Sequence, residues 1–134
     1  DVDLYRYFIG RADQSVNESV MLGRVDQQLR VNYHMIDAHD LRQVAGKSKE
    51  LAKYMYRYLT IMMTISSIFL TMDGSPEALG KRTQLWEYLR TVDSGLYGRM
   101  RYLSLAGATD MPTLPGRKLS IAIYRLARKI YKFN

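Results

Sequence analysis

The chain has 134 residues, 47% of them hydrophobic, which is enough to bury one core, so a single domain is expected. It contains no cysteine, which excludes disulfides and thiolate metal sites and agrees with a reducing compartment. The formal net charge of +7 favours an anionic partner or surface.

The N-terminal residues predict a short strand and a turn. Residues 1–10, DVDLYRYFIG, alternate weakly and are rich in aromatic side chains, which is typical of a strand. Such a strand has no partner in an otherwise helical chain, and the sequence does not open with Met, so we expect a piece excised from a longer protein. After a loop at residues 10–15, Ser15 and Glu18 have the spacing of a capping box.

A first long helix is predicted from the capping box to about residue 44. Five apolar side chains recur on one face at helical spacing, with Asn32 among them: Leu22, Val25, Leu29, Tyr33 and Ile36. Residues 45–47 then form a short turn into the next helix. Because the connection is short, the two helices are expected to form an antiparallel pair.

Residues 48–72, SKELAKYMYRYLTIMMTISSIFLTM, predict the central helix of the fold. At 3.6 residues per turn, its polar side chains fall within an arc of roughly 80°; they are Lys49, Lys53, Arg57, Thr60, Thr64, Ser67 and Thr71. The rest of its surface must be covered by helices or by lipid. Charges at Lys53 and Arg57 leave too short an apolar run for a bilayer span, so helices are the expected cover. Ser48 predicts the N-cap, and Asp73 with Gly74 predicts the end.

Two further helices are predicted before a long loop. Ser75 caps a third helix that starts at Pro76, carries the single tryptophan and runs to about Val92. Asp93 caps a fourth, short helix at residues 94–103. Residues 104–116 contain two prolines and two glycines, which predicts a loop.

The last segment, residues 117–133, predicts a basic amphipathic helix. Its apolar side carries Leu119, Ala122, Ile123, Leu126, Ile130 and Phe133, and its other side carries Arg117, Lys118, Arg125, Arg128, Lys129 and Lys132. Six cations without an acid suit an interfacial helix on anionic lipid. The alternative is a helix that docks on the bundle and turns its basic face to water or to a partner.

Signals for catalysis or metal binding are weak in this sequence. Asp1 and Asp3 have the spacing of a carboxylate pair, but nothing precedes them to complete a metal site. His34 and His39 are five residues apart, which places them on different faces of a helix. No nucleophile–base arrangement and no glycine-rich phosphate loop is visible.

Tyrosines alternate with cations in four segments, YRYFIGR, KYMYRY, YGRMRY and YRLARKIYK. Such pairs can stack on bases or hold phosphates. They can equally be snorkelling side chains at the edge of a core. No recognition motif accompanies the charge, so nucleic-acid binding is not the favoured interpretation.

Arg11, Gln14, Ser15 and Val16 form an Arg-x-x-Gln-Ser-Val turn after the tyrosine-rich strand. The segment LYRYFIGRADQSVN resembles the one that closes the catalytic domain of bacterial family-two glycosyltransferases. RVDQQLRVNYHMID and YRLARKIYKFN resemble the helical tail of such enzymes, especially those of capsule, exopolysaccharide or cell-wall glycan assembly. The resemblance covers the two ends of the chain and little of the middle.

The resemblance implies that residues 1–15 end an upstream catalytic domain and that residues 16–134 form a non-catalytic helical domain. The nucleotide-sugar site and its divalent metal would lie upstream, so no cofactor is expected in this chain. Arg11, Gln14 and Ser15 are the candidate substrate contacts, since a cation and an amide suit a donor phosphate or an acceptor hydroxyl. The alternative is that this turn only ties the strand to the first helix.

We therefore expect an all-α bundle of four or five helices with a short N-terminal strand. The expected function is that of a non-catalytic tail of a glycosyltransferase, which transfers sugar from a nucleotide donor to a glycan or lipid-linked acceptor. The expected location is cytoplasmic, at the inner face of the membrane, with the upstream domain and anionic lipid as partners. The rival hypothesis is a stand-alone basic module that binds an acidic protein or nucleic acid. The oligomeric state, a homo-oligomer included, stays open.

Overall fold

The computed structural model describes residues 18–38, 40–109 and 113–131, and within these ranges the chain is all α-helical. The helices are α1 (Glu18–Gly23), α2 (Val25–Ala38), α3 (Leu41–Lys47), α4 (Lys49–Asp73), α5 (Pro76–Val92), α6 (Ser94–Leu103), α7 (Leu105–Ala108) and α8 (Leu114–Tyr131). The predicted all-α class and the helical bundle are confirmed. The strand predicted at residues 1–10 lies outside the described ranges, as does Ser15 of the capping box.

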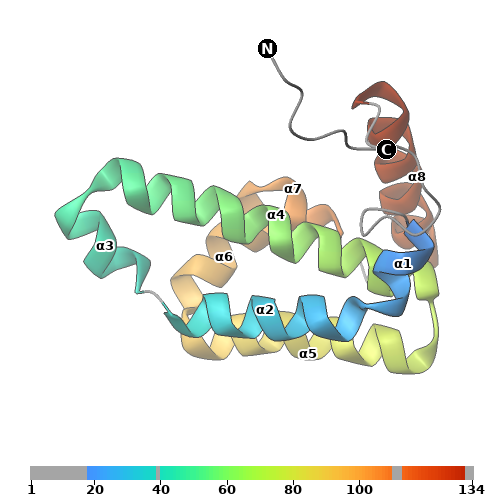
Figure 1. The fold of residues 1–134 in the computed structure, drawn as a ribbon, viewed down its shortest axis with the longest axis horizontal. Helices are drawn as coiled ribbons and strands as arrows, with labels where there is room; N and C mark the ends of the chain where they lie inside the picture. The colour runs from blue at the N-terminus through green and yellow to red at the C-terminus, as the bar shows by residue number, and fades with distance from the viewer. Residues whose placement is uncertain (1–17, 39, 110–112, 132–134) are drawn as a thin grey trace, which may run out of the picture.

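Helix α4 is the central helix, as its narrow polar stripe predicts. It packs against α1, α2, α3, α5, α7 and α8, and it crosses the molecule from α3 at one end toward α8 at the other (Figure 1). The Ser48 side chain caps it by accepting a hydrogen bond from the Leu51 N–H at 3.2 Å. Gly74 ends it in the left-handed conformation, with φ of 70°, which glycine adopts without strain.

The polar stripe predicted on α4 is wrong in its second half. Lys49, Lys53 and Arg57 are exposed, whereas Ser67 and Thr71 are buried. Ser67 and Thr71 face polar side chains of α5, which satisfy their hydroxyl groups and let this side of the helix enter the core. In the first half of α4, water instead reaches four large side chains that were predicted to be covered: Leu51, Tyr54, Tyr58 and Ile61.

The single helix predicted up to residue 44 is also wrong, because three helices occupy this stretch. The first break falls at Gly23 and Arg24, where glycine weakens the helix by about 1 kcal/mol relative to alanine. The second precedes Asp40, whose carboxylate caps α3 by accepting hydrogen bonds from the N–H groups of Arg42 and Gln43 at 2.8 and 3.3 Å. The predicted antiparallel pairing survives, with α2 and α4 side by side and α3 between them in the chain (Figure 1).

Helices α5 and α6 begin and end where the sequence predicts. Ser75 caps α5 through the Ala78 N–H at 3.1 Å, and Asp93 caps α6 through the Leu96 N–H at 2.8 Å. The loop predicted at residues 104–116 is wrong in part, because the one-turn helix α7 and the first turn of α8 fall inside it. Ser104 starts α7 by accepting a hydrogen bond from the Ala106 N–H. The prolines and glycines of residues 104–116 predicted a loop, so this capping role of Ser104 was not predicted.

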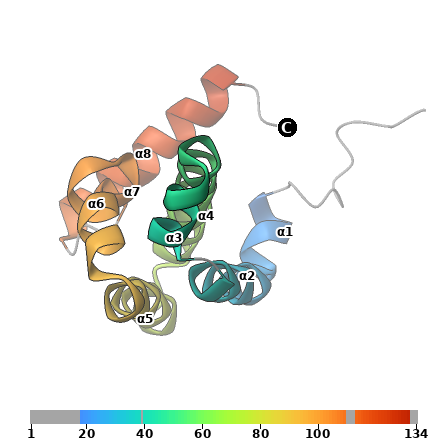
Figure 2. The ribbon, with the colours of Figure 1, turned by 90° about the vertical axis from the view of Figure 1, so that its left-hand side faces the viewer.

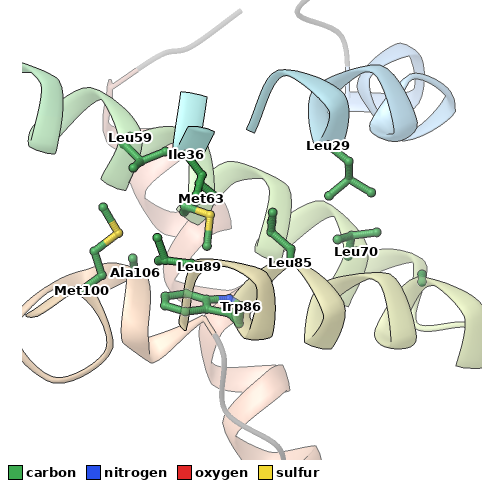
Figure 3. Close-up of a cluster of buried hydrophobic side chains, with 11 residues drawn as sticks. Leu29, Ile36, Leu59, Met63, Leu70, Leu85, Trp86, Leu89, Met100 and Ala106 are labelled. Atoms are coloured by element: carbon green, nitrogen blue, oxygen red, sulfur yellow. The ribbon is translucent and has the colours of Figure 1, made fainter. Parts of the chain in front are cut away.

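The core lies between α2, α4, α5 and α6, which Figure 2 shows from one end of the bundle. Figure 3 shows its apolar side chains converging from these helices, with Trp86 of α5 among them. The fully buried ones include Met63 and Leu70 from α4, Leu85 and Leu89 from α5, and Met100 from α6.

Candidate functional site

The residues that the resemblance assigned to substrate contact are Arg11, Gln14 and Ser15, and all three lie outside the described residues. The same holds for Asp1, Asp3 and His39, whereas His34 is exposed on α2. In residues 18–38, 40–109 and 113–131, no group of three or more His, Cys, Asp or Glu side chains is placed to hold a metal ion. None of the helices in these ranges has both the length and the hydropathy to cross a bilayer.

Helix α8 docks on the bundle through small and aromatic side chains rather than through its predicted apolar side. Gly116 and Ser120 are buried, and the Ser120 hydroxyl lies 2.7 Å from the carbonyl oxygen of Ala108 in α7. One turn further on, the Tyr124 ring meets Phe69 of α4 edge to face, with 6.0 Å between the ring centroids. These contacts hold the helix against α4 and α7.

The predicted apolar side of α8 is exposed along its described part. Leu119 is 53% exposed and Ile123 is 54% exposed, and Leu114 in the first turn is also exposed. Lys118 and Arg125 are exposed too. The alternative in which the apolar side packs into the bundle is therefore not what the structure has. The helix docks and still leaves this side open.

Helix α8 docks on the bundle and leaves its apolar side exposed because these are different faces of the helix, and its cations lie on a third face. At about 100° per residue, the docked pair Ser120 and Tyr124 defines one direction. Leu119 and Ile123 lie roughly 100° from it on one side, and the cations at 118 and 125 lie roughly 130° from it on the other. The surface directed away from the bundle therefore combines an apolar strip with a basic strip. We call this surface the outer face of α8, defined by Lys118, Leu119, Ile123 and Arg125.

The other predicted cations of this helix are placed differently. Arg117 is half-buried rather than exposed, because it lies one turn before Ser120 on the docked side of the helix. Arg128 and Lys129 belong to α8, but their side chains are not among the described ones, and Lys132 lies outside the described ranges.

A second surface, which the sequence analysis missed, is a basic groove between α3, α4 and α6. It encloses about 440 Å³, and its charged lining residues are Arg42, Lys49, Lys53, Asp93 and Arg99. The segments KYMYRY and YGRMRY each supply one part of it, Lys53 and Tyr56 from the first and Arg99 from the second. Nothing in the sequence showed that these two segments lie side by side, since that depends on how α4 and α6 pack.

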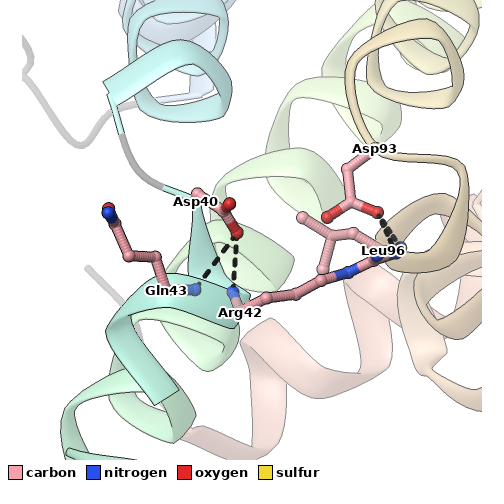
Figure 4. A network of polar contacts seen from close by, with 5 residues as sticks. All are labelled: Asp40, Arg42, Gln43, Asp93 and Leu96. Atoms are coloured by element: carbon pink, nitrogen blue, oxygen red, sulfur yellow. Dashed lines mark hydrogen bonds and ion pairs between the residues drawn. The ribbon is translucent and has the colours of Figure 1, made fainter. Parts of the chain in front are cut away.

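Figure 4 shows how the polar groups at one end of this groove are held. The Asp93 carboxylate accepts a hydrogen bond from the Leu96 N–H, and the Arg42 guanidinium approaches the same oxygen at 3.5 Å. On the other wall, the Arg99 guanidinium lies over the Tyr56 ring, 4.3 Å from its centroid. The backbone of Gly95 leaves room for Arg42, since a Cβ atom there would lie 2.7 Å from its Nη2.

The first half of α4 carries a third surface, which is apolar and aromatic. Tyr54 and Tyr58 stack one turn apart, with ring centroids 6.3 Å apart, and Leu51 and Ile61 extend the exposed strip along the helix. We call these four residues the α4 strip. Exposed apolar side chains that are contiguous in this way are typical of contact surfaces.

The raised pKa values of Tyr88 and Lys81 belong to groups outside these surfaces. The Tyr88 hydroxyl donates to Asp37 at 2.6 Å, which raises the pKa of Tyr88. Hydrogen bonds to Asp26 and Glu77 raise the pKa of Lys81, whose ammonium lies 2.8 and 2.9 Å from the two carboxylates. The Tyr88 and Lys81 bonds to Asp37 and Asp26 tie α5 to α2.

Comparison of this chain with protein families, with curated proteins and with solved structures finds no match.

Proposed function

We propose that this helical domain is a non-catalytic accessory domain that binds an anionic membrane surface through the outer face of α8. The observation that carries the proposal is the exposure of two apolar side chains, Leu119 and Ile123, and of two cations, Lys118 and Arg125, on a helix that is already docked by another face. An interfacial helix needs an apolar strip to enter the headgroup region and cations to meet anionic lipid. Both lie on the side of α8 that the bundle does not use.

The magnitudes support reversible binding. Each cation near an anionic bilayer contributes about 1 kcal/mol. Full burial of one Leu or Ile side chain contributes about 1.5 to 3 kcal/mol, and about half of that remains to be gained by Leu119 and Ile123, which are 53% and 54% exposed. The two cations and two apolar side chains on the described part of the outer face are therefore enough for measurable attachment to the bilayer.

We further propose that the parent protein is a glycosyltransferase that uses a nucleotide sugar and a divalent metal bound upstream of this domain. The support is the resemblance of the segment around Arg11 and Gln14 to the end of such catalytic domains. In this proposal α8 keeps the enzyme at the inner face of the membrane, near a lipid-linked acceptor. We assign the α4 strip to contact with the upstream domain, because it is exposed and apolar and lies on a different helix from the outer face of α8.

Co-sedimentation with lipid vesicles tests the membrane proposal. Binding should be strong on vesicles of phosphatidylcholine mixed with phosphatidylglycerol, weak on phosphatidylcholine alone, and lower as added salt screens the charges. The double variant Lys118→Gln/Arg125→Gln should lose most of the anionic-lipid binding. Leu119→Ser/Ile123→Ser should lose the part of the binding that persists at high salt.

The matched control is Arg24→Gln/Arg30→Gln, which removes two exposed cations from the region of α2. This variant should bind vesicles like the unchanged protein. Failure of the unchanged protein to bind anionic vesicles at low salt would contradict the proposal. An equal loss in the control would mean that net charge alone, and not the outer face of α8, drives binding.

A further inference from the structure

The basic groove between α3, α4 and α6 has more positive charge than its own residues neutralise. Four cations from three helices line it with a single carboxylate: Arg42 from α3, Lys49 and Lys53 from α4, Arg99 from α6, and Asp93 at the start of α6. Lys49 and Lys53 form no ion pair within the described part of the chain. The charged groups of lysine and arginine repel each other when they lie close together in a groove, and a bound anion offsets this repulsion.

The carboxylate in the groove is already engaged. Asp93 accepts the hydrogen bond of the Leu96 N–H at 2.8 Å, which caps α6. Its contact with Arg42 is 3.5 Å long, well beyond the 2.7 to 2.9 Å of a strong charge-assisted hydrogen bond. The Arg42 side chain is 77% exposed, so it is free to turn toward a ligand in the groove.

Arg99, on the other side of the groove, is held in place more firmly than Arg42. The Cζ atom of Arg99 lies 4.3 Å from the centroid of the Tyr56 ring, which is within cation–π distance and holds Arg99 beside α4. Lys49 and Lys53 are four residues apart, so they project from the same face of α4 one turn apart. The groove thus brings together two lysines from α4, one arginine from α3 and one arginine from α6.

We propose that this groove binds a diphosphate group. A diphosphate has two phosphoryl groups in a row and more charge than a single phosphate, so it can reach the lysines of α4 and the arginines of α3 and α6 together. Guanidinium groups bind phosphoryl oxygens in pairs, and lysine acts as a point charge beside them. The volume of about 440 Å³ lies within the range of sites for small ligands. This proposal does not depend on membrane binding by α8.

Calorimetric titration with inorganic pyrophosphate at low ionic strength tests the proposal, with orthophosphate as the comparison ligand. Pyrophosphate should bind roughly tenfold more tightly than orthophosphate, because it makes at least one more charged contact. Lys49→Gln/Lys53→Gln should weaken pyrophosphate binding by roughly tenfold or more. Both lysines are exposed, so the fold should tolerate this change.

Gly95→Ala tests the groove without changing any charge. The new methyl group would lie 2.7 Å from the Arg42 Nη2 atom and force that flexible side chain aside. Alanine is also a better helix residue than glycine, so α6 should keep its stability. Pyrophosphate binding should weaken severalfold, while the thermal unfolding temperature should hold or rise.

Two variants serve as controls. Arg24→Gln/Arg30→Gln and Lys118→Gln/Arg125→Gln each remove two cations outside the groove and should bind pyrophosphate like the unchanged protein. The proposal is overturned if these controls lose as much binding as Lys49→Gln/Lys53→Gln, or if pyrophosphate binds no better than orthophosphate. Unchanged vesicle binding by Lys49→Gln/Lys53→Gln would show that the groove and the outer face of α8 act separately, as proposed.

The source of the diphosphate is distinguished by two further ligands, adenosine diphosphate and geranyl diphosphate. Tighter binding of the first supports a soluble nucleotide, and tighter binding of the second supports a lipid diphosphate. A short single-stranded oligonucleotide completes the series. If it binds the groove and pyrophosphate does not, the surface is a nucleic-acid site and the diphosphate proposal is wrong.

Discussion

Polar side chains from α2 and α5 meet α4 inside the core. The Asn32 amide donates to Ser66 at 2.7 Å, the Trp86 indole donates to Ser67 at 3.0 Å, and Arg82 donates to Thr71 at 3.0 Å. All six residues are buried. Buried hydrogen bonds of this kind add little net stability, but their loss leaves a donor without water, which costs about 1 to 3 kcal/mol. They therefore fix the rotation of α4 against its neighbours.

Ser67→Ala should reduce the free energy of unfolding by about 1 to 3 kcal/mol, because the Trp86 N–H loses its acceptor in the core. Thr64→Ala is the comparison, since the Thr64 hydroxyl donates only to the backbone of its own helix, at Thr60. It should cost less than about 1 kcal/mol. Urea unfolding followed by the fluorescence of Trp86 measures both. An equal loss of unfolding free energy in the two variants would contradict the stabilising role of the indole hydrogen bond.

The hydrogen bonds to Asp73 predict that the stability of the fold depends on pH in the acid range. Hydrogen bonds from the Ser75 side chain, and then from its backbone N–H at 3.0 Å, hold the pKa of Asp73 below its usual 3.8. The stabilisation of the fold by the ionised Asp73 carboxylate is fully present above pH 3.8, and it is lost as the pH falls through the lower pKa of the folded state. Asp73→Asn should therefore make stability fall less steeply in that acid range. Urea midpoints measured from neutral to acid pH check this, and identical slopes for both proteins would contradict it.

At the scale of single helices, α4 and α8 each use different faces for different tasks. The first half of α4 is partly exposed, with Ile61 at 55%, and its second half is mostly buried, with Ile68 at 6%. The change occurs where α5, α7 and α8 close around it. Helix α8 divides its circumference among the bundle, an apolar strip and a basic strip. One amphipathic pattern along a helix therefore does not imply one environment.

Replacing isoleucine along α4 should report this change of environment. Ile68→Ala should cost about 2 to 5 kcal/mol, because it leaves a cavity in the core. Ile61→Ala should cost less than about 1 kcal/mol, since its side chain is already more than half in water. Ile65 is half-buried and should fall between the two. Chemical denaturation of the three variants provides the ranking, and a flat ranking would contradict the burial described for α4.

At the scale of the whole molecule, the two charged surfaces lie at opposite ends. The basic groove opens where α3 joins α4, and α8 docks near the far end of α4 (Figure 1). The two proposals therefore place the membrane at one end of the domain and the anionic ligand at the other. Neither task requires a catalytic residue within this chain.

The proposed role as an accessory domain predicts that the purified chain has no glycosyltransferase activity of its own. The donor site is proposed to lie upstream, so incubation with nucleotide sugars and manganese or magnesium should release no more nucleotide than a buffer control. Chromatographic detection of free nucleotide measures this. Turnover above the control would overturn the assignment of this chain to the non-catalytic part.

The sequence by itself determined the helical class, the central position of α4 and the ends of α4, α5 and α6. These follow from local chemistry, since Ser48, Ser75 and Asp93 cap the helix that comes directly after them and Gly74 stops α4. It also determined that α8 is basic and amphipathic, because that property depends only on spacing along one helix.

Only the tertiary structure decided which faces are covered. The burial of Ser67 depends on Trp86, which is nineteen residues away along the chain, and the basic groove needs Lys53 of α4 beside Arg99 of α6. The exposure of Leu119 and Ile123 depends on α8 docking through Ser120 and Tyr124. Periodicity gives the pattern on a helix, but the helix that packs against it comes from a distant part of the chain. For that reason both candidate surfaces took their final form only in the folded molecule.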